Sequence, residues 1–279
     1  MRHRNVAADE SVVVLRSMGA AALRPSRRQL PPFRWRAEAP EMRIRIKEFP
    51  PLFRDRREAG ALLARRLAAL ADTPDLLVLA LPRGGVPIAY EVARALRAPL
   101  DIVLVRKLGV PGHAELAMGA IAEGGVRVLN HAVIRELGIP PDIIEHITTE
   151  EQRILEQRRR LYRGDRRPPA VEGARVILID DGLATGMTMQ AAIEAVRQGS
   201  PAGIIVATPV AAPESVAEIE PLVDEVVALA TPELLYAIGM WYSDFTPTSD
   251  EEVRTLLTEA FCGYAPAPRS DEALERGAT

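Results

Sequence analysis

The sequence is poor in cysteine, histidine and aromatic residues, and it lacks a long apolar run. Cys262 is the one cysteine among 279 residues and cannot form an internal disulfide, so we expect a protein of the reducing cytoplasm. The histidines show no spacing typical of zinc ligands. No apolar stretch approaches the roughly eighteen residues that a membrane span needs. A net charge of −3 also gives the chain no nucleic-acid-binding signature.

The charge is unevenly spread along the chain. Residues 1–41 hold eight arginines and four acidic residues, a net charge of +4, whereas the remainder carries −7. This first segment has no sustained hydrophobic period, so we expect a disordered extension or a mis-annotated start. One domain is expected over residues 42–265, and a loose polar tail over residues 266–279.

The most informative segment is Val176–Thr188, with the sequence VILIDDGLATGMT. Its apolar residues predict a buried strand that ends in Asp180 and Asp181, and a helix is predicted over residues 187–198. Loop N–H groups, the positive helix end and threonine hydroxyls can bind a phosphate. Because carboxylates repel a bare phosphate, we expect sugar hydroxyls or a metal ion between the two carboxylates and the phosphate. The alternative is an ordinary Asp-Asp-Gly turn with a threonine N-cap.

This segment resembles the signature of the type I phosphoribosyltransferases, which bind 5-phosphoribosyl-1-pyrophosphate (PRPP). The signature has two acidic residues, three variable residues, Thr-Gly, one variable residue and Thr, and every fixed position is met. The resemblance implies that Asp180 and Asp181 are catalytic and hold the ribose hydroxyls. It further implies a PRPP-binding loop made of Gly182, Leu183, Ala184, Thr185, Gly186, Met187 and Thr188.

A second element lies upstream, where the apolar strand predicted over Leu76–Leu81 ends in Pro-Arg-Gly-Gly. Pro87 then suits the first turn of a helix. Gly84 and Gly85 let the backbone approach an anion closely, and Arg83 offers several donors to phosphate oxygens. In the resemblance, this is the pyrophosphate loop, in which Arg83, Gly84 and Gly85 bind the pyrophosphate of PRPP. Taken alone, it would be a glycine turn with a surface arginine.

A third element follows a strand predicted over Asp101–Val105. Arg106 and Lys107 come next, and Lys107 is one of only two lysines, against thirty-three arginines. The resemblance implies that Arg106 binds PRPP and that Lys107 is catalytic, as a partner of the leaving pyrophosphate. A solvated lysine at a strand end is the alternative. The sequence VPGHAE that follows looks like the mobile loop that closes over PRPP, with His113 and Glu115 as candidate site residues.

Strands and helices alternate from Leu76 to Ala230. This order predicts an α/β fold: a single domain with a mostly parallel twisted sheet flanked by helices. Inserted in it we expect a hairpin over residues 116–129, a short helix capped by Asn130, and a long helix over residues 141–163. Ligands of such sheets lie at the carboxyl ends of the strands, where all three elements are expected.

The segment Leu234–Phe245 holds four of the twelve aromatic residues. Family members often have a small hood in which an aromatic ring stacks on a base, so Trp241 or Tyr242 is a candidate for stacking on the acceptor. A packed cap on the core is the alternative and the favoured one. Thr248–Glu251 is predicted as a capping box for the final helix.

The resemblance implies transfer of a phosphoribosyl group from PRPP to a nitrogen acceptor, a nucleobase, with release of pyrophosphate. It implies Mg²⁺ as cofactor, held mainly through PRPP and in part by Asp180 and Asp181. The expected partners are these small molecules, with no nucleic acid and no membrane, and a homodimer is one assembly to test. Two alternatives stay open: a PRPP-sensing binding protein, and another Mg-dependent enzyme of phosphoribosyl sugar phosphates.

Overall fold

The computed structural model describes residues 52–164, 166 and 168–263. The predictions for residues 1–41 and 266–279 fall outside this range. Five parallel strands form the main sheet, in the order β2-β1-β6-β7-β8. Their bounds are β1 (Leu76–Ala80), β2 (Leu100–Ile102), β6 (Arg175–Ile179), β7 (Gly203–Val210) and β8 (Glu225–Ala230). The predicted α/β fold with a mostly parallel sheet is confirmed.

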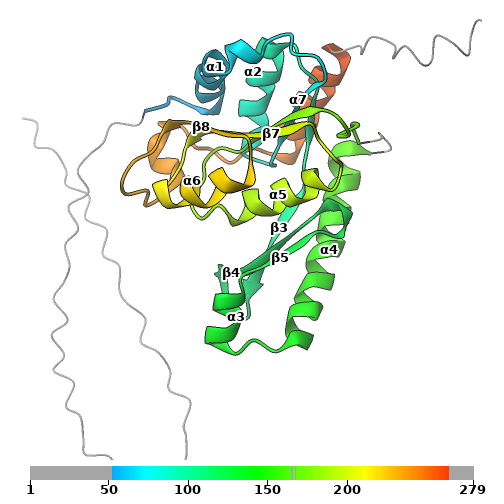
Figure 1. The fold of residues 1–279 in the computed structure, drawn as a ribbon, viewed down its shortest axis with the longest axis vertical. Coiled ribbons are helices and arrows are strands. Elements are labelled where there is room, and N and C mark those ends of the chain that lie inside the picture. Colours follow the sequence, from blue (N-terminus) through cyan, green and yellow to red (C-terminus); the bar gives the residue numbers. More distant parts are fainter. Residues whose placement is uncertain (1–51, 165, 167, 264–279) are drawn as a thin grey trace, which may run out of the picture. The chain divides into compact units, whose positions relative to one another are not determined.

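Helices cover both faces of this sheet (Figure 1). Alternate strand residues face opposite sides, so Val78 and Ile177 belong to one core while Leu77 and Leu178 belong to the other. The first core includes residues of α1 (Arg56–Arg66), α2 (Gly85–Leu96), α4 (Pro141–Arg163) and α7 (Asp250–Gly263), and the second includes residues of α5 (Met187–Arg197) and α6 (Pro213–Ile219). Burial on both faces explains why the central strands are apolar throughout.

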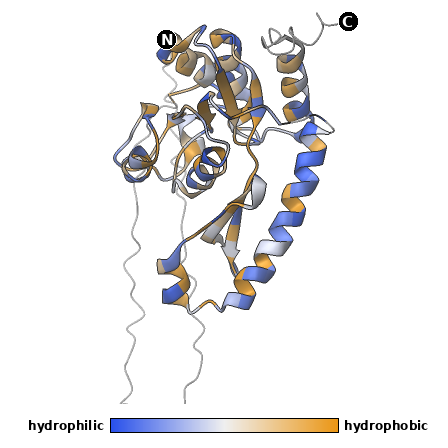
Figure 2. Ribbon diagram, turned by 45° about the vertical axis from the view of Figure 1, so that its right-hand side comes forward, coloured by the Kyte–Doolittle hydropathy of each residue, from blue (hydrophilic) through white to orange (hydrophobic). Residues whose placement is uncertain are grey.

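A smaller antiparallel sheet interrupts the parallel one. Its strands are β3 (Val105–Val110), β4 (His113–Ala122) and β5 (Arg127–Leu129), in the order β3-β4-β5. After β5 come α3 (His131–Leu137), whose N-cap is Asn130 as predicted, and the 23-residue α4. Figure 2 shows α4 as a largely hydrophilic helix interrupted by hydrophobic residues. None of the described helices combines the length and apolar character needed to cross a membrane.

The structure differs from two expectations about this region. The strand predicted over residues 101–105 is two strands, because β2 ends at Ile102 and the antiparallel β3 begins at Val105. The predicted mobile loop is a hairpin turn, since Val110 pairs directly with His113 and only two residues separate them. Pro111 fixes a turn dihedral and Gly112 supplies a φ of +77°, as such a tight connection requires.

Short 3₁₀ segments complete the fold. They are η1 (Ala68–Leu70), η2 (Glu123–Gly125), η3 (Glu220–Leu222) and η4 (Ile238–Trp241). The predicted cap of α7 is off by one residue. Ser249, not Thr248, accepts the hydrogen bond from the N–H of Glu252, at 3.0 Å, whereas Thr248 is buried.

Candidate functional site

The β6–α5 loop, residues 180–186, joins the carboxyl end of β6 to the first turn of α5. Asp180 turns its side chain back on the backbone, and its Oδ1 accepts from the N–H of Asp181 at 2.8 Å. Gly186 takes a left-handed conformation, φ +68°, and serves as the N-cap residue of α5 without a side-chain hydrogen bond. The first N–H groups of α5 are therefore left without a side-chain cap, which favours an anion at this helix end.

Residues of β7 and α6 hold this loop in place. Leu183 forms a β-bridge with Ala211, and the loop also receives a hydrogen bond from the Ser215 hydroxyl to the carbonyl of Ala184, at 2.8 Å. Thr208, fully buried, donates to the carbonyl of Asp180 at 3.2 Å. Sequence reasoning missed both hydroxyls, because Ser215 and Thr208 lie in otherwise ordinary helix and strand patterns.

The β1–α2 loop packs directly against the two carboxylates. A Cβ atom on Gly84 would collide with the side chain of Asp181, and one on Gly85 would lie 2.5 Å from the carbonyl oxygen of Ile179. Only glycine leaves room for this approach. The peptide bond between Pro82 and Arg83 is cis.

Arg56, at the start of α1, binds the carboxylate of Asp181. Its Nε and Nη2 both donate to Asp181 Oδ2, at 3.0 and 2.8 Å, and its Nη1 donates to the carbonyl of Thr246 at 2.9 Å. The guanidinium carbon also lies 3.9 Å from the centre of the Phe245 ring. The side chains of Arg56 and Asp181 are only 10% and 15% exposed, respectively. Sequence reasoning missed Arg56, since it is one of many arginines in the chain.

The adjacent carboxylates differ in their electrostatic surroundings. Burial and the neighbouring charge of Asp181 raise the pKa of Asp180 well above its ordinary value, with Arg56 and Lys107 opposing the rise. Burial also raises the pKa of Asp181, and the Arg56 guanidinium again opposes it. Two half-buried carboxylates side by side, with cations close to both, are suited to binding hydroxyl groups or a cation between them.

These elements surround a cavity of about 130 Å³. Lys107 reaches it from β3 and Ile238 from η4, while the remaining lining comes from the acidic pair, the β6–α5 loop and the start of α5. The cavity lies at the carboxyl ends of the parallel strands, the edge at which sheets of this type bind ligands. It joins carboxylates, a cation and an uncapped helix N-terminus within one small space.

Comparison with known proteins shows the family of the chain. The model of the phosphoribosyl transferase domain matches residues 55–231, which include the acidic pair and the β6–α5 loop. The chain belongs to this family.

Two curated proteins and one solved structure illustrate the similarity. A Mycobacterium tuberculosis protein (strain H37Rv), described as "Putative phosphoribosyl transferase Rv0571c", is 43% identical over 224 residues, 80% of this chain and 50% of that protein. A protein of strain CDC 1551, described as "Putative phosphoribosyl transferase MT0597", matches with the same identity and coverage. The chain thus spans about half the length of these curated relatives. The crystal structure of TT1426 from Thermus thermophilus is 45% identical with a TM-score of 0.64, over 74% of this chain and 98% of that one.

Of the predicted site residues of this phosphoribosyl transferase, the cavity gathers the acidic pair, Lys107, residues 182–186 and Thr188. Met187 is the first residue of α5, beside them. Gly84 and Gly85 adjoin the acidic pair. Arg83 is partly exposed, and its Nη1 lies 3.7 Å from Asp250 at the start of α7, so its side chain is directed to α7 in this structure.

Arg106 does not line the cavity. Its Nε donates to Glu151 of α4 at 2.6 Å, because neighbouring residues of β3 point to opposite faces and Lys107 takes the face toward the cavity. In this structure Arg106 is thus directed to α4, and its assignment to PRPP binding stays a prediction. His113 is exposed in the first residues of β4, and Glu115 follows in the same strand, so neither is in a loop beside the cavity.

Tyr242 is a packing residue of this phosphoribosyl transferase, not a free stacking platform. It is buried, its ring packs against Phe53 and Phe245 with centroids 5.3 and 5.0 Å away, and its hydroxyl donates to the carbonyl of Asp181 at 2.7 Å. Burial raises the pKa of this hydroxyl. Trp241 is half-buried against the same cluster. The alternative of a packed cap describes both residues, and the expected stacking by Tyr242 does not fit this structure.

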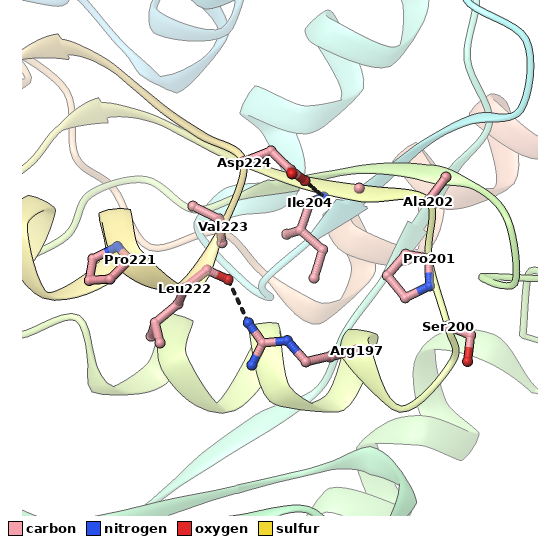
Figure 3. Close-up of a pocket in the computed structure, with 10 residues that line it drawn as sticks. Arg197, Ser200, Pro201, Ala202, Ile204, Pro221, Leu222, Val223 and Asp224 are labelled. Carbon is pink, nitrogen blue, oxygen red and sulfur yellow. Dashed lines mark hydrogen bonds between the residues drawn. The ribbon is translucent and has the colours of Figure 1, made fainter.

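A second hollow, of about 440 Å³, lies at the amino ends of β7 and β8, away from the strand ends that carry the site (Figure 3). Its charged side chains are used internally. Arg197 donates to the carbonyl of Leu222 at 2.5 Å, and Asp224 accepts from the N–H of Ile204 at 2.7 Å. This hollow is larger than the cavity at the acidic pair, but it lies away from the loop and the carboxylates described above.

Proposed function

We propose that this chain binds PRPP and transfers its phosphoribosyl group to a nitrogen acceptor, a nucleobase, releasing pyrophosphate. The observation that carries the proposal is the cavity in which Asp180, Asp181 and Lys107 meet the β6–α5 loop and the start of α5. The family match over residues 55–231 supports it. Because the chain spans about half of its curated relatives, the proposal concerns the described domain.

Each part of the cavity receives a different part of PRPP. The β6–α5 loop and the uncapped end of α5 bind the 5-phosphate through N–H groups, with Thr185 and Thr188 adding hydroxyl donors. Asp180 and Asp181 accept hydrogen bonds from the ribose hydroxyls. The pyrophosphate lies along Gly84 and Gly85, within reach of Lys107.

The reaction breaks the bond from C1 of the ribose to the pyrophosphate oxygen and forms a bond from C1 to the acceptor nitrogen. As the leaving group departs, positive charge develops on the ring and negative charge on the pyrophosphate. The carboxylates of the acidic pair stabilise the first, and Lys107 stabilises the second. Fixing the 5-phosphate in the loop holds the reacting carbon in place.

Magnesium belongs to the proposal as a cation carried mainly by the substrate. No group of three or more His, Cys, Asp or Glu side chains that could hold a metal forms among the described residues. Two adjacent carboxylates at the cavity do fit Mg²⁺, which is commonly bound by one or two carboxylates plus substrate oxygens. When bound with PRPP, it would neutralise charge on the leaving pyrophosphate. A cytoplasmic location is part of the same proposal.

Isothermal titration calorimetry of the full chain with PRPP and Mg²⁺ tests the binding step. We expect saturable binding and a higher melting temperature, since only the folded chain presents the assembled cavity. Failure of millimolar PRPP with Mg²⁺ to bind or to shift the melting temperature would refute the proposal.

Pyrophosphate release across a panel of nucleobases tests the transfer step. We expect release that depends on one class of base. Binding without release for any base would instead indicate a PRPP-binding regulatory protein.

A further inference from the structure

The contacts of Arg56 extend the proposed function, on which this inference rests. Asp181 Oδ2 is enclosed between the guanidinium of Arg56, which donates two hydrogen bonds to it, and the backbone of Gly84, which has no room for a Cβ atom. Among the described residues, no side chain donates a hydrogen bond to the second oxygen of Asp181, Oδ1, since both bonds from Arg56 go to Oδ2. One oxygen of this carboxylate is therefore held by Arg56, while the other has no side-chain donor on a residue that lines the cavity.

Arg56 is itself firmly fixed. Its third donor group binds the carbonyl of Thr246, its plane lies over the ring of Phe245, and the side chain is 10% exposed. The Tyr242 hydroxyl holds the backbone of Asp181 from the same segment. Arg56 thus connects residues 242–246 to the acidic pair through contacts that a flexible surface arginine would not make.

We propose that Arg56 is a positioning residue, which orients Asp181 so that its Oδ1 accepts from a ribose hydroxyl of PRPP. Arg56 touches no substrate atom in this arrangement and acts through Asp181. A guanidinium suits the role, since its planar donors fix the direction of a carboxylate where a lysine supplies only a point charge. The loss of Arg56 should therefore weaken binding of a ribose more than binding of a phosphate.

The test compares two ligands in the full chain with Mg²⁺ present: ribose 5-phosphate, which carries the hydroxyls, and inorganic phosphate, which does not. Arg56→Gln should lose roughly tenfold or more in affinity for ribose 5-phosphate, by analogy with a lost hydrogen bond to a charged group. Its affinity for inorganic phosphate should stay within about twofold. Arg57→Gln is the matched control, because Arg57 is exposed and pairs with Glu91, 3.6 Å away. It should behave as the parent with both ligands.

A double-mutant cycle tests whether Arg56 acts through Asp181. If it does, Arg56→Gln combined with Asp181→Asn should bind ribose 5-phosphate no more weakly than Asp181→Asn alone. Additive losses would overturn the inference. So would an equal loss for both ligands, which would indicate a general structural role, or parent-like binding of ribose 5-phosphate in Arg56→Gln.

Arg56→Lys keeps the test decisive if Arg56→Gln does not fold. It retains the charge but not the paired donors, so its affinity for ribose 5-phosphate should be lowered while inorganic phosphate binds as in the parent. Parent-like binding of both ligands would then overturn the inference. If the parent chain binds PRPP and the Arg56 variants bind both ligands as the parent does, only the positioning role of Arg56 is refuted. If the parent chain binds neither PRPP nor ribose 5-phosphate, the proposed function is refuted as well.

Discussion

The β6–α5 loop and the surroundings of Asp181 differ in how their contacts are distributed along the chain. The loop is continuous with a strand and a helix, and the N–H groups that it offers belong to residues adjacent in sequence. Asp181 is instead held by Arg56, which is 125 residues away, and by Tyr242, which is 61 residues away. The proposed phosphate site is thus formed by residues adjacent in sequence, whereas the orientation of Asp181 depends on contacts between distant segments.

We expect the largest effect from substitutions in the acidic pair, which adjoins both the β6–α5 loop and Arg56. Asp180→Asn or Asp181→Asn keeps the shape and removes a charge that matters most in the transition state. Turnover should fall roughly a hundredfold or more, while PRPP affinity falls less because the β6–α5 loop is intact. Steady-state kinetics with calorimetry measure both quantities.

Thr188→Val is the counterpart of these substitutions, since it removes a hydroxyl donor of the 5-phosphate site. It should lower affinity before turnover. Activity equal to the parent in both Asn variants would show that the carboxylates only complete a turn.

A second prediction concerns the close approach of Gly84 to Asp181. In Gly84→Ala the new methyl group overlaps a carboxylate that Arg56 holds on its other side, so the loop or the carboxylate has to move. We expect a loss of about 1–3 kcal/mol in the free energy of unfolding together with weaker PRPP binding.

Gly173→Ala is its control, at a positive φ of +70° with open space around it. It should cost about 1–2 kcal/mol of stability and leave PRPP affinity unchanged. If both variants bind PRPP as the parent does, the packing of Gly84 on Asp181 has no part in the site.

A third prediction separates two neighbouring cations of β3. Lys107→Gln removes a cation that lines the cavity and should weaken PRPP binding roughly tenfold. Arg106→Gln breaks the pair with Glu151 and should cost under about 1 kcal/mol of stability, with no change in affinity. Calorimetry and thermal melts on both variants check this. A larger loss of affinity in Arg106→Gln than in Lys107→Gln would show that the two faces of β3 are assigned the wrong way round.

The sequence predicts what is encoded locally and misses what is not. The strand, acidic pair, glycine–threonine loop and helix at residues 176–198 follow from hydrophobic periodicity and helix signals, and so do the bounds of α4. Residues 101–105 look like one apolar strand, so the sequence does not predict the break between β2 and β3. The signal available for a hairpin is the alternation of apolar Leu108 and Val110 with Lys107 and Gly109, followed by Pro111-Gly112.

Arg56, Ser215 and Ile238 could not be found in this way. Each belongs to an element whose own pattern is satisfied without it, and its role depends on which distant segment the fold brings beside it. The same holds for Tyr242, whose burial between Phe53 and Phe245 is a property of tertiary packing. Aromatic content alone indicated either a stacking platform or a cap, and only the packing distinguishes them.

We expect the smallest effect from a substitution that removes a long-range contact of the β6–α5 loop. Although the N–H groups of the loop are local, long-range contacts hold it in place, among them the hydrogen bond from the Ser215 hydroxyl to the carbonyl of Ala184. Ser215→Ala should lower stability by about 1 kcal/mol and weaken PRPP binding a few-fold, since Ala184 is exposed and water can replace the lost donor. Thr149→Ala is the matched control, because it removes a hydroxyl that donates to a carbonyl at 2.9 Å within α4. Thermal melts and calorimetry on the two variants distinguish the cases. A PRPP affinity that falls in neither variant would mean that the loop keeps its shape without the Ser215 hydrogen bond. An equal fall in both would mean that the loss is not specific to this contact of the loop.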